Sequence, residues 1–508
     1  MKTDKTKSSI LNAIAMITQT GIISLLSLIS TNLILKNYGS DFNGVVATAS
    51  QLINLLLIVE GGFSLAINVA LFKPYVENNQ TKINSIMSAS KKIFFKIGII
   101  FFILGIAISL IYPLFIKSNL NYITIFLIFL MVISATAYNL MFIIKSQIMF
   151  QVSQKEYTVA FLGTMVNLVS SIVTIVLVYN KINMLIVRLF LLIFTLINGI
   201  LILILYKKRF PNINTNCKPD YNEIKGTKDI MIQKLTSVVY MASPLLFIST
   251  FISTKMASVY AVYYSIYNII KMLLSSMVAA PINGFGQLLS KSKDDDTYQK
   301  FKLYEYITIL SSTILLSSVL VVILPFISLY TKSITDINYI NLPIAIMLAL
   351  ILFLEIIHIP SGSIINITGN FKIAKKFQTI TCIILVSLLS IGGYFYGIYG
   401  ILVGTIITNI LLASMEIKYT HKKIFNANIK NIINKLITNL FLIILLVVIE
   451  RLLLPQIDSY IKFFAFGFII FIINVFIILI VNKIFFNNEI KGINKLLTEM
   501  RKKIIKKK

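Results

Sequence analysis

Charge, cysteine and histidine are scarce in this chain of 508 residues, and tryptophan is absent. Only 13% of the residues are charged, about half the share found in soluble domains, and 57% are hydrophobic. Two cysteines, Cys217 and Cys382, lie far apart and give no basis for a disulfide framework or a metal site. The two histidines, His358 and His421, are too few to predict a metal centre or a catalytic triad. No glycine cluster precedes a Lys-Ser or Lys-Thr pair, so no ATP-driven motor is expected. Nothing in the sequence predicts an enzyme.

Long apolar runs fill the sequence instead. The mean hydropathy is +0.87, and runs of roughly 20 residues, the length that crosses the hydrocarbon of a bilayer, recur from end to end. No polar stretch is long enough for a separate soluble domain, and no small-residue cleavage site follows the first apolar run. The sequence therefore predicts an all-α polytopic membrane protein.

We predict about fourteen transmembrane helices from these runs. Their approximate ranges are 10–35, 45–72, 93–116, 121–144, 157–179, 184–206, 235–254, 257–283, 303–328, 339–366, 377–397, 398–417, 436–454 and 461–482.

The basic residues orient these helices. With the N-terminus in the cytoplasm, 37 of the 47 Lys and Arg residues fall in cytoplasmic segments and 7 in the outside turns. This is the bias that the positive-inside rule describes, so both termini are predicted to be cytoplasmic. The net charge of +28 follows from the same bias, and nucleic acid is not expected as a partner.

The longest cytoplasmic loop, 207–234, divides the first twelve helices into two groups of six. We expect an N-terminal lobe, 1–206, and a C-terminal lobe, 235–417, as in transporters built from parallel repeats. Helices 13 and 14, within 418–482, and a basic cytoplasmic tail, 483–508, complete the predicted organisation.

A weak internal repeat supports two pseudo-symmetric lobes. Residues 30–36 resemble residues 249–255, and residues 51–56 resemble residues 265–270, at corresponding places in each half. In this register Lys271 has an apolar counterpart, so its charge is not duplicated.

The predicted span 257–283 carries a lysine near its middle. A lysine at the centre of a bilayer costs roughly 2.5–3.5 kcal/mol on insertion scales, so this helix must face protein or water. The residues that share the face of the lysine at helical spacing are Tyr260, Tyr264, Tyr267, Lys271 and Ser275. We predict that this face lines a wet cavity; an ion pair within the protein is the alternative for Lys271.

Glu60 lies near the middle of the second predicted helix and is a candidate partner for Lys271. At helical spacing it shares a face with Ser64 and Asn68.

Glu355 and His358 share a face of the tenth predicted helix. An acid beside a histidine within the membrane suggests coupling to a proton or sodium gradient, and a local hydrogen bond is the alternative.

Arg188 lies near the outer end of the sixth helix. On the first helix, Ser24 and Ser27 belong to a polar stripe that suits either a cavity or close helix packing.

Two segments resemble Wzx-type polysaccharide flippases, within the multidrug/oligosaccharidyl-lipid/polysaccharide exporter superfamily. In the first segment, 35–67, the matching residues are Tyr38, Gly39, Phe42, Gly44, Glu60, Gly61 and Gly62. Asn43 stands between Phe42 and Gly44, so the turn departs from the family pattern by one residue. The second segment, 393–404 with sequence GYFYGIYGILVG, is similar to the family's turn between helices 11 and 12.

This resemblance implies a flippase for undecaprenyl-pyrophosphate-linked oligosaccharide repeat units, feeding O-antigen or capsule assembly from a bacterial inner membrane. The substrate would cross from the cytoplasmic to the outer leaflet by alternating access, and helices 13 and 14 would form a groove for the lipid tail. The implied partners are this lipid-linked glycan, membrane lipids and other proteins of polysaccharide assembly; no cofactor or metal is implied.

In this superfamily helices 1, 2, 7 and 8 line the central cavity. The resemblance therefore implies a site in which lysine binds the pyrophosphate and tyrosines bind the sugar. The candidate substrate-binding residues are Lys271, Tyr264, Tyr267, Tyr260, Ser275, Ser24, Ser27 and Arg188. The candidate ion-coupling residues are Glu355, His358 and Glu60.

Three alternatives remain. A lipid II flippase or a cation-coupled multidrug exporter would share the fold. A membrane polysaccharide polymerase or ligase is the enzymatic alternative, but it would need a large outside loop, and the predicted outside turns are short.

Overall fold

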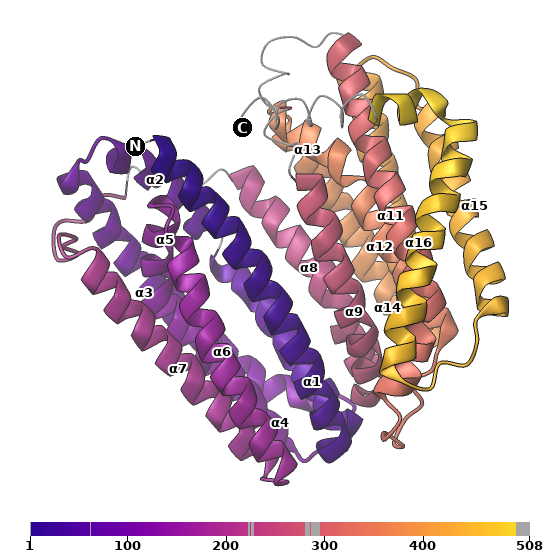
Figure 1. The fold of residues 1–508 in the computed structure, drawn as a ribbon. Coiled ribbons are helices and arrows are strands. Elements are labelled where there is room, and N and C mark those ends of the chain that lie inside the picture. Colours follow the sequence, from indigo (N-terminus) through magenta and orange to yellow (C-terminus); the bar gives the residue numbers. More distant parts are fainter. Residues whose placement is uncertain are drawn as a thin grey trace. The chain divides into compact units, whose positions relative to one another are not determined.

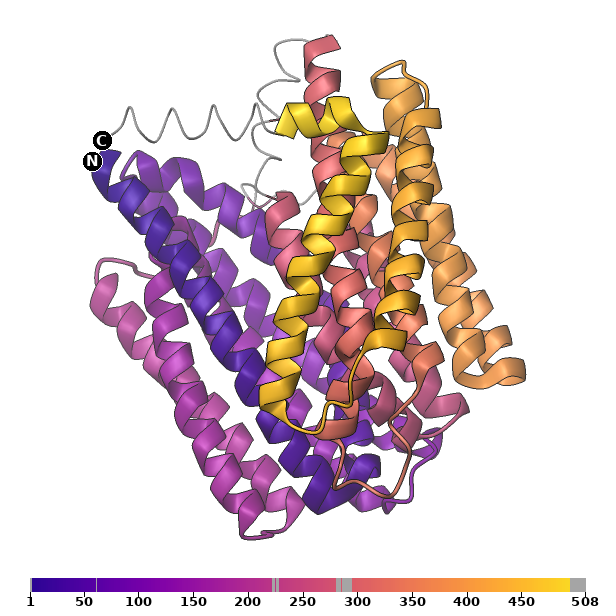
Figure 2. The same ribbon diagram turned by 45° about the vertical axis from the view of Figure 1, so that its right-hand side comes forward.

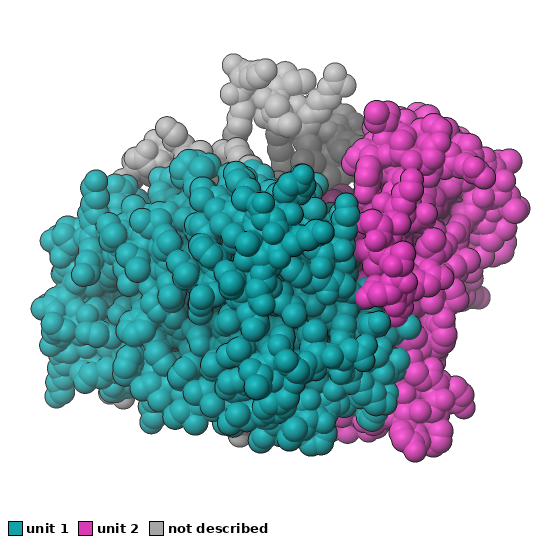
Figure 3. Space-filling model, turned by 90° about the horizontal axis from the view of Figure 1, so that it is seen from below, with its two compact units in different colours: residues 1–261 teal, residues 262–508 magenta. Residues whose placement is uncertain are grey.

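The computed structural model describes residues 2–60, 62–221, 224, 228–279, 285 and 295–493. Within these residues the regular structure is entirely helical (Figure 1). The contacts divide the chain into two compact units, 1–261 and 262–508, which Figure 3 colours teal and magenta.

The first unit is built around α1, along which both α6 and α8 pack. Its helices are α1 (Lys2–Leu56), η1 (Leu57–Glu60), α2 (Phe63–Val76), α3 (Gln80–Ile111), η2 (Tyr112–Leu114), α4 (Tyr122–Tyr138), η3 (Asn139–Ile143), α5 (Ile144–Val152), α6 (Glu156–Tyr179), α7 (Met184–Arg209) and α8 (Lys228–Phe251). The unit boundary falls inside α9 (Thr254–Ala279), whose first two turns belong to the first unit.

The second unit is organised around α11, which packs against α12, α15 and α16. Its helices after α9 are α11 (Asp295–Tyr330), α12 (Leu342–Ile357), α13 (Ile359–Ile367), α14 (Phe371–Tyr419), η4 (Thr420–Ile424), α15 (Lys430–Leu453) and α16 (Tyr460–Phe485).

The prediction of about fourteen membrane-spanning helices is confirmed. Among the described residues, eleven helical segments are long and apolar enough to cross a membrane. Two of these segments are each divided by a break, at Gly39 in α1 and at Gly397 in α14, so that each joins parts of two predicted spans. With α9, which carries two lysines, the total is fourteen.

Glycine makes both breaks possible. Gly39 has φ 83° and ψ 171°, and Gly397 has φ 58° and ψ −140°, conformations that side chains with a Cβ rarely adopt. The two arms of α14, before and after Gly397, touch near the break. A Cβ on Gly392 would lie 2.6 Å from the carbonyl oxygen of Gly400. The turn predicted within 393–404 is therefore confirmed.

The second predicted helix, 45–72, is not continuous. The chain passes from α1 through η1 and begins α2 only after Gly62, which has φ 79°. The expectation that Glu60 and Ser64 share a regular helical face is therefore wrong. Instead the backbone N–H of Ser64 donates to Glu60 Oε1 at 2.6 Å, and the carboxylate stabilises the N-terminus of α2.

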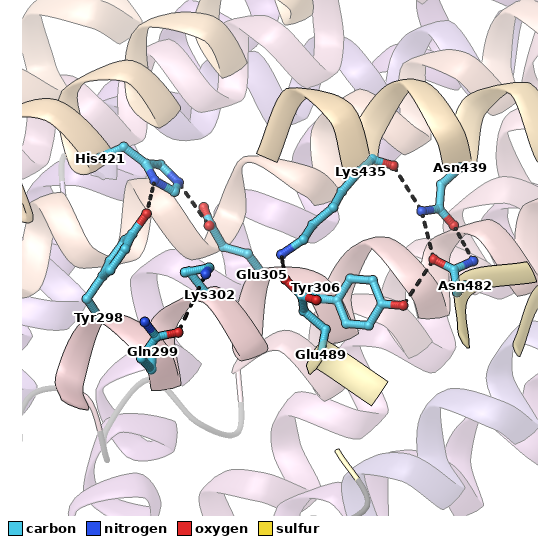
Figure 4. Close-up of polar contacts among 10 residues, drawn as sticks. All are labelled: Tyr298, Gln299, Lys302, Glu305, Tyr306, His421, Lys435, Asn439, Asn482 and Glu489. Atoms are coloured by element: carbon cyan, nitrogen blue, oxygen red, sulfur yellow. Dashed lines mark hydrogen bonds and ion pairs between the residues drawn. The ribbon is translucent and has the colours of Figure 1, made fainter. Parts of the chain in front are cut away.

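Buried polar contacts fix α15 and α16 on α11 (Figure 4). The hydroxyl of Tyr306 on α11 donates to Asn482 Oδ1 on α16 at 3.0 Å, and Asn482 exchanges hydrogen bonds with Asn439 of α15. Lys435, only 2% exposed, pairs with Glu489 at 2.7 Å. Because unpaired polar groups are costly in a membrane interior, these contacts set the register of the three helices.

Candidate functional site

The first unit contains a cavity of about 670 Å³. Its walls come from α1, η1, α2, η3, α5 and α8, and most of the lining side chains are apolar. The polar side chains on the wall are Asn54, Glu60, Ser64 and Lys234. The cavity is therefore an apolar space with one concentrated charged spot.

That spot is an ion pair between Lys234 Nζ and Glu60 Oε2. The glutamate side chain is 6% exposed, whereas the lysine side chain is 50% exposed. The carboxylate, which also accepts from Ser64 N–H, is thus held in the wall, and the ammonium group is the accessible member of the pair.

The sequence predicts Lys234 as the last residue of the cytoplasmic loop 207–234. The helix α8 begins at Lys228, earlier than the predicted start at residue 235, so Lys234 lies on a helix instead. The first residues of α8 are polar, and hydropathy alone predicts such residues as loop. The sequence therefore does not predict that the helix begins before residue 235.

Lys271 on α9 has Glu355 on α12 as its partner, at 2.7 Å between Nζ and Oε2. The two side chains are about equally accessible, 24% and 25% exposed. The alternative prediction for Lys271, an ion pair within the protein, is therefore confirmed. The suggested pairing of Lys271 with Glu60 is wrong.

The predicted tyrosine face of α9 divides into two parts. Tyr260 and Tyr267 are buried, and the Tyr267 hydroxyl donates to the carbonyl of Ala345 on α12 at 2.7 Å. Tyr264 and Ser275 are partly exposed, as Lys271 is. The accessible part of this face is consequently Tyr264, Lys271 and Ser275.

The remaining predicted substrate-binding residues lie on α1 and α7. Ser24 is partly exposed and Ser27 is exposed. Arg188, in the second turn of α7, holds its guanidinium 5.5 Å from the ring centroid of Phe42, a cation–π contact. Among the described residues no carboxylate lies within ion-pair distance of Arg188.

Glu355 and His358, predicted as one coupling pair, have different partners. His358 Nδ1 lies 2.8 Å from Glu416 Oε2, near the end of α14, while Glu355 pairs with Lys271. His358 thus makes a local hydrogen bond, which is the alternative that the sequence analysis gives to ion coupling.

A second histidine–carboxylate pair joins α11 to η4 (Figure 4). His421 Nε2 lies 2.9 Å from Glu305 Oε2, with the side chains 2% and 3% exposed, and the hydroxyl of Ser361 donates to Glu305 Oε1 at 3.0 Å. Glu305 and Glu416 are not among the residues predicted from the sequence, although an acid within a predicted apolar span is a signal for such a site. Among the described residues, no group of three or more His, Cys, Asp or Glu side chains is arranged to hold a metal ion.

No protein-family model and no curated protein sequence matches the chain. Its fold is similar to that of solved transporters. A structure of the lipid II flippase MurJ in an inward closed conformation superposes with a TM-score of 0.65 at 16% identity, over 94% of this chain and 99% of that chain. An inward-facing MATE family multidrug resistance transporter of the MOP superfamily gives 0.61 at 12% identity, over 84% and 95%. An outward-facing MATE structure gives 0.52 at 11% identity, over 87% and 96%.

Proposed function

We propose that this protein is a flippase that carries undecaprenyl-pyrophosphate-linked oligosaccharide repeat units between the leaflets of a membrane by alternating access. The observation that carries the proposal is the Glu60–Lys234 pair on the cavity wall, with the lysine accessible and the glutamate buried. A diphosphate needs a cation, and lysine is a common phosphate ligand. Charged residues inside membrane spans are costly and mark substrate and ion pathways.

The pair also supplies a way to couple transport to an ion gradient. The diphosphate of the substrate competes with the Glu60 carboxylate for the ammonium group of Lys234. When Lys234 binds phosphate, the buried carboxylate loses its counter-ion and takes up a proton. Lys271 and Glu355 would repeat this exchange in the second unit, with Tyr264 against the sugar. Transport by this scheme involves no covalent step.

Two observations favour a lipid-linked substrate over a cationic drug. The accessible charge in the cavity belongs to a lysine, which would repel a cationic drug. An apolar groove of about 290 Å³ lies among α12, α14 and α15 and includes Lys418. Because α15 lies beyond the twelfth predicted helix, this groove suits a lipid tail.

Lipid II is the second candidate substrate. The similarity in fold to MurJ, named as a lipid II flippase, extends over 99% of that chain. Both candidates present an undecaprenyl diphosphate, so the same lysines would serve either one, and the sugars distinguish them.

The test uses the purified protein in liposomes that contain a fluorescent lipid-linked oligosaccharide or lipid II. Transfer to the outer leaflet is followed by adding a membrane-impermeant reagent that modifies the sugar. Lys234→Gln should lower the transfer rate at least tenfold, and Glu60→Gln should retain transfer but lose its dependence on an imposed proton gradient. The matched control is Lys73→Gln, because the Lys73–Glu77 pair is largely exposed and 3.9 Å long.

Wild-type rates for Lys234→Gln, with normal protein content, would exclude this pair from substrate binding. Transfer of lipid II without transfer of the oligosaccharide would establish the second candidate. Transfer of neither lipid by the wild-type protein would refute the proposed function.

A further inference from the structure

Three polar side chains meet between the last two helices and α11. Asn474 of α16 donates from Nδ2 to Glu450 Oε2 on α15 at 3.2 Å and to Ser318 Oγ on α11 at 3.1 Å. Asn474 is completely buried and Ser318 is buried. None of the roles proposed above involves these residues.

The cluster has more acceptors than donors. Glu450 Oε1 and Asn474 Oδ1 are both buried and have no hydrogen-bond partner. In the part of the chain that the structure describes, no lysine or arginine lies within ion-pair distance of Glu450. A buried acceptor without a donor is unfavourable by about 1–3 kcal/mol, and a buried charge without a partner is worse.

Asn474 lies far from both ends of its helix. Asn474 is 14 residues after the start of α16 and 11 before its end, which places it roughly 21 Å and 16 Å from the two ends. Glu450 meets Asn474 from the last turn of α15, which ends at Leu453. The non-helical linker 454–459 then leads to the start of α16 (Figure 2).

Other titratable groups on the packed helices lie toward the helix ends. There are none between residues 307 and 329 of α11, or between residues 463 and 482 of α16. The flanking ones are Tyr306 and Tyr330 on α11, Tyr460, Lys462 and Lys483 on α16, and Arg451 and Lys435 on α15. Lys462 is paired with Asp458, and Lys435 with Glu489. No second charge is therefore available to compensate a Glu450 carboxylate from α11 or α16.

We propose that Glu450 is a proton-binding site and that the helices pack in this way with Glu450 as the neutral acid. One proton on Oε1 supplies the donor that the cluster lacks and removes an uncompensated charge from the apolar interior. A metal cation fits less well, because Asn474 Nδ2 already donates to Glu450 Oε2 and Ser318 Oγ. Only two oxygens remain free, whereas hard cations such as Mg²⁺ and Ca²⁺ take about six or more.

Loss of the proton would place a charge between α15, α16 and α11 and weaken their packing. Proton binding at Glu450 would thus control how firmly the last two helices are held. Proton binding would also affect a lipid tail held by these two helices, and this consequence rests on the proposed function. The proton site itself does not rest on it.

The test measures thermal unfolding of the purified protein in nanodiscs, in sodium-free buffers from mildly acidic to mildly alkaline pH. A group that is protonated in the folded protein and ionised when unfolded makes stability fall as pH rises. The wild type should therefore lose melting temperature with rising pH, and Glu450→Gln, which mimics the neutral acid, should lose less. Glu77→Gln is the control, since Glu77 is half exposed and lies outside the cluster.

Infrared spectroscopy gives a second, independent readout. The wild type and the Glu77→Gln variant should show a carboxylic-acid C=O band near neutral pH that is absent from Glu450→Gln. The proposal is overturned if this band is unchanged in Glu450→Gln, or if both proteins depend on pH equally. Stabilisation of the wild type, but not of Glu450→Gln, by sodium at constant pH would identify a cation site instead. Glu450→Leu is the second neutral variant, and failure of both variants to fold would also overturn the proposal. None of these measurements requires transport.

Discussion

Variants of the ion pair between Lys271 and Glu355 can separate two roles of Lys271, in substrate binding and in stability. Lys271→Gln keeps a side chain of similar length but leaves Glu355 without the cation that lies 2.7 Å away. Breaking a fully buried pair costs about 3–5 kcal/mol, and an exposed pair contributes about 0–1 kcal/mol. Because each side chain here is about a quarter exposed, we expect a loss of about 1–3 kcal/mol in the free energy of unfolding.

The exchange variant Lys271→Glu with Glu355→Lys restores the attraction with the charges reversed. It should recover most of the stability lost in Lys271→Gln, as measured by denaturation in detergent. It should not recover transfer of the lipid-linked substrate in liposomes, because the cation then lies on α12 rather than beside Tyr264 on α9. We expect at least a tenfold lower transfer rate for both variants.

Two results would refute this reasoning. Recovery of both stability and transfer by the exchange variant would mean that Lys271 serves only the ion pair. An unchanged free energy of unfolding in Lys271→Gln would mean that the pair contributes nothing to stability, and the position of the cation would then have to be tested by transfer alone.

Two further predictions concern stability. His421→Ala should lower the free energy of unfolding by about 2–4 kcal/mol, because it leaves the 3% exposed Glu305 side chain without its histidine partner; a loss below about 1 kcal/mol in denaturant titration would contradict this. Gly400→Ala should cost about 1–3 kcal/mol, since the new Cβ would overlap the backbone of Gly392 across the two arms of α14. The control is Gly467→Ala, where nothing lies within 4 Å of the added Cβ, and equal melting temperatures for the two variants would disprove the close approach.

The spans and the main turns could be predicted from the sequence because they depend on local properties. The number of apolar runs determines how many helices can cross a bilayer. Gly39 and Gly397 stand where the chain must adopt a positive φ, a requirement that acts on single residues. The cost of a lysine in the membrane likewise singled out Lys271 without knowledge of its neighbours.

The partners of the charged groups were decided only by the tertiary structure. Glu60 and Lys234 are 174 residues apart, and Glu305 and His421 are 116 apart. Periodicity predicts which residues share a face of one helix, but it does not say which helix that face meets or at what depth. Those choices depend on how whole helices pack, and a shift of one turn would separate each pair. For this reason the sequence predicts Lys234 at the end of a loop and does not single out Glu450, although helix packing places one on a cavity wall and the other in a buried polar cluster.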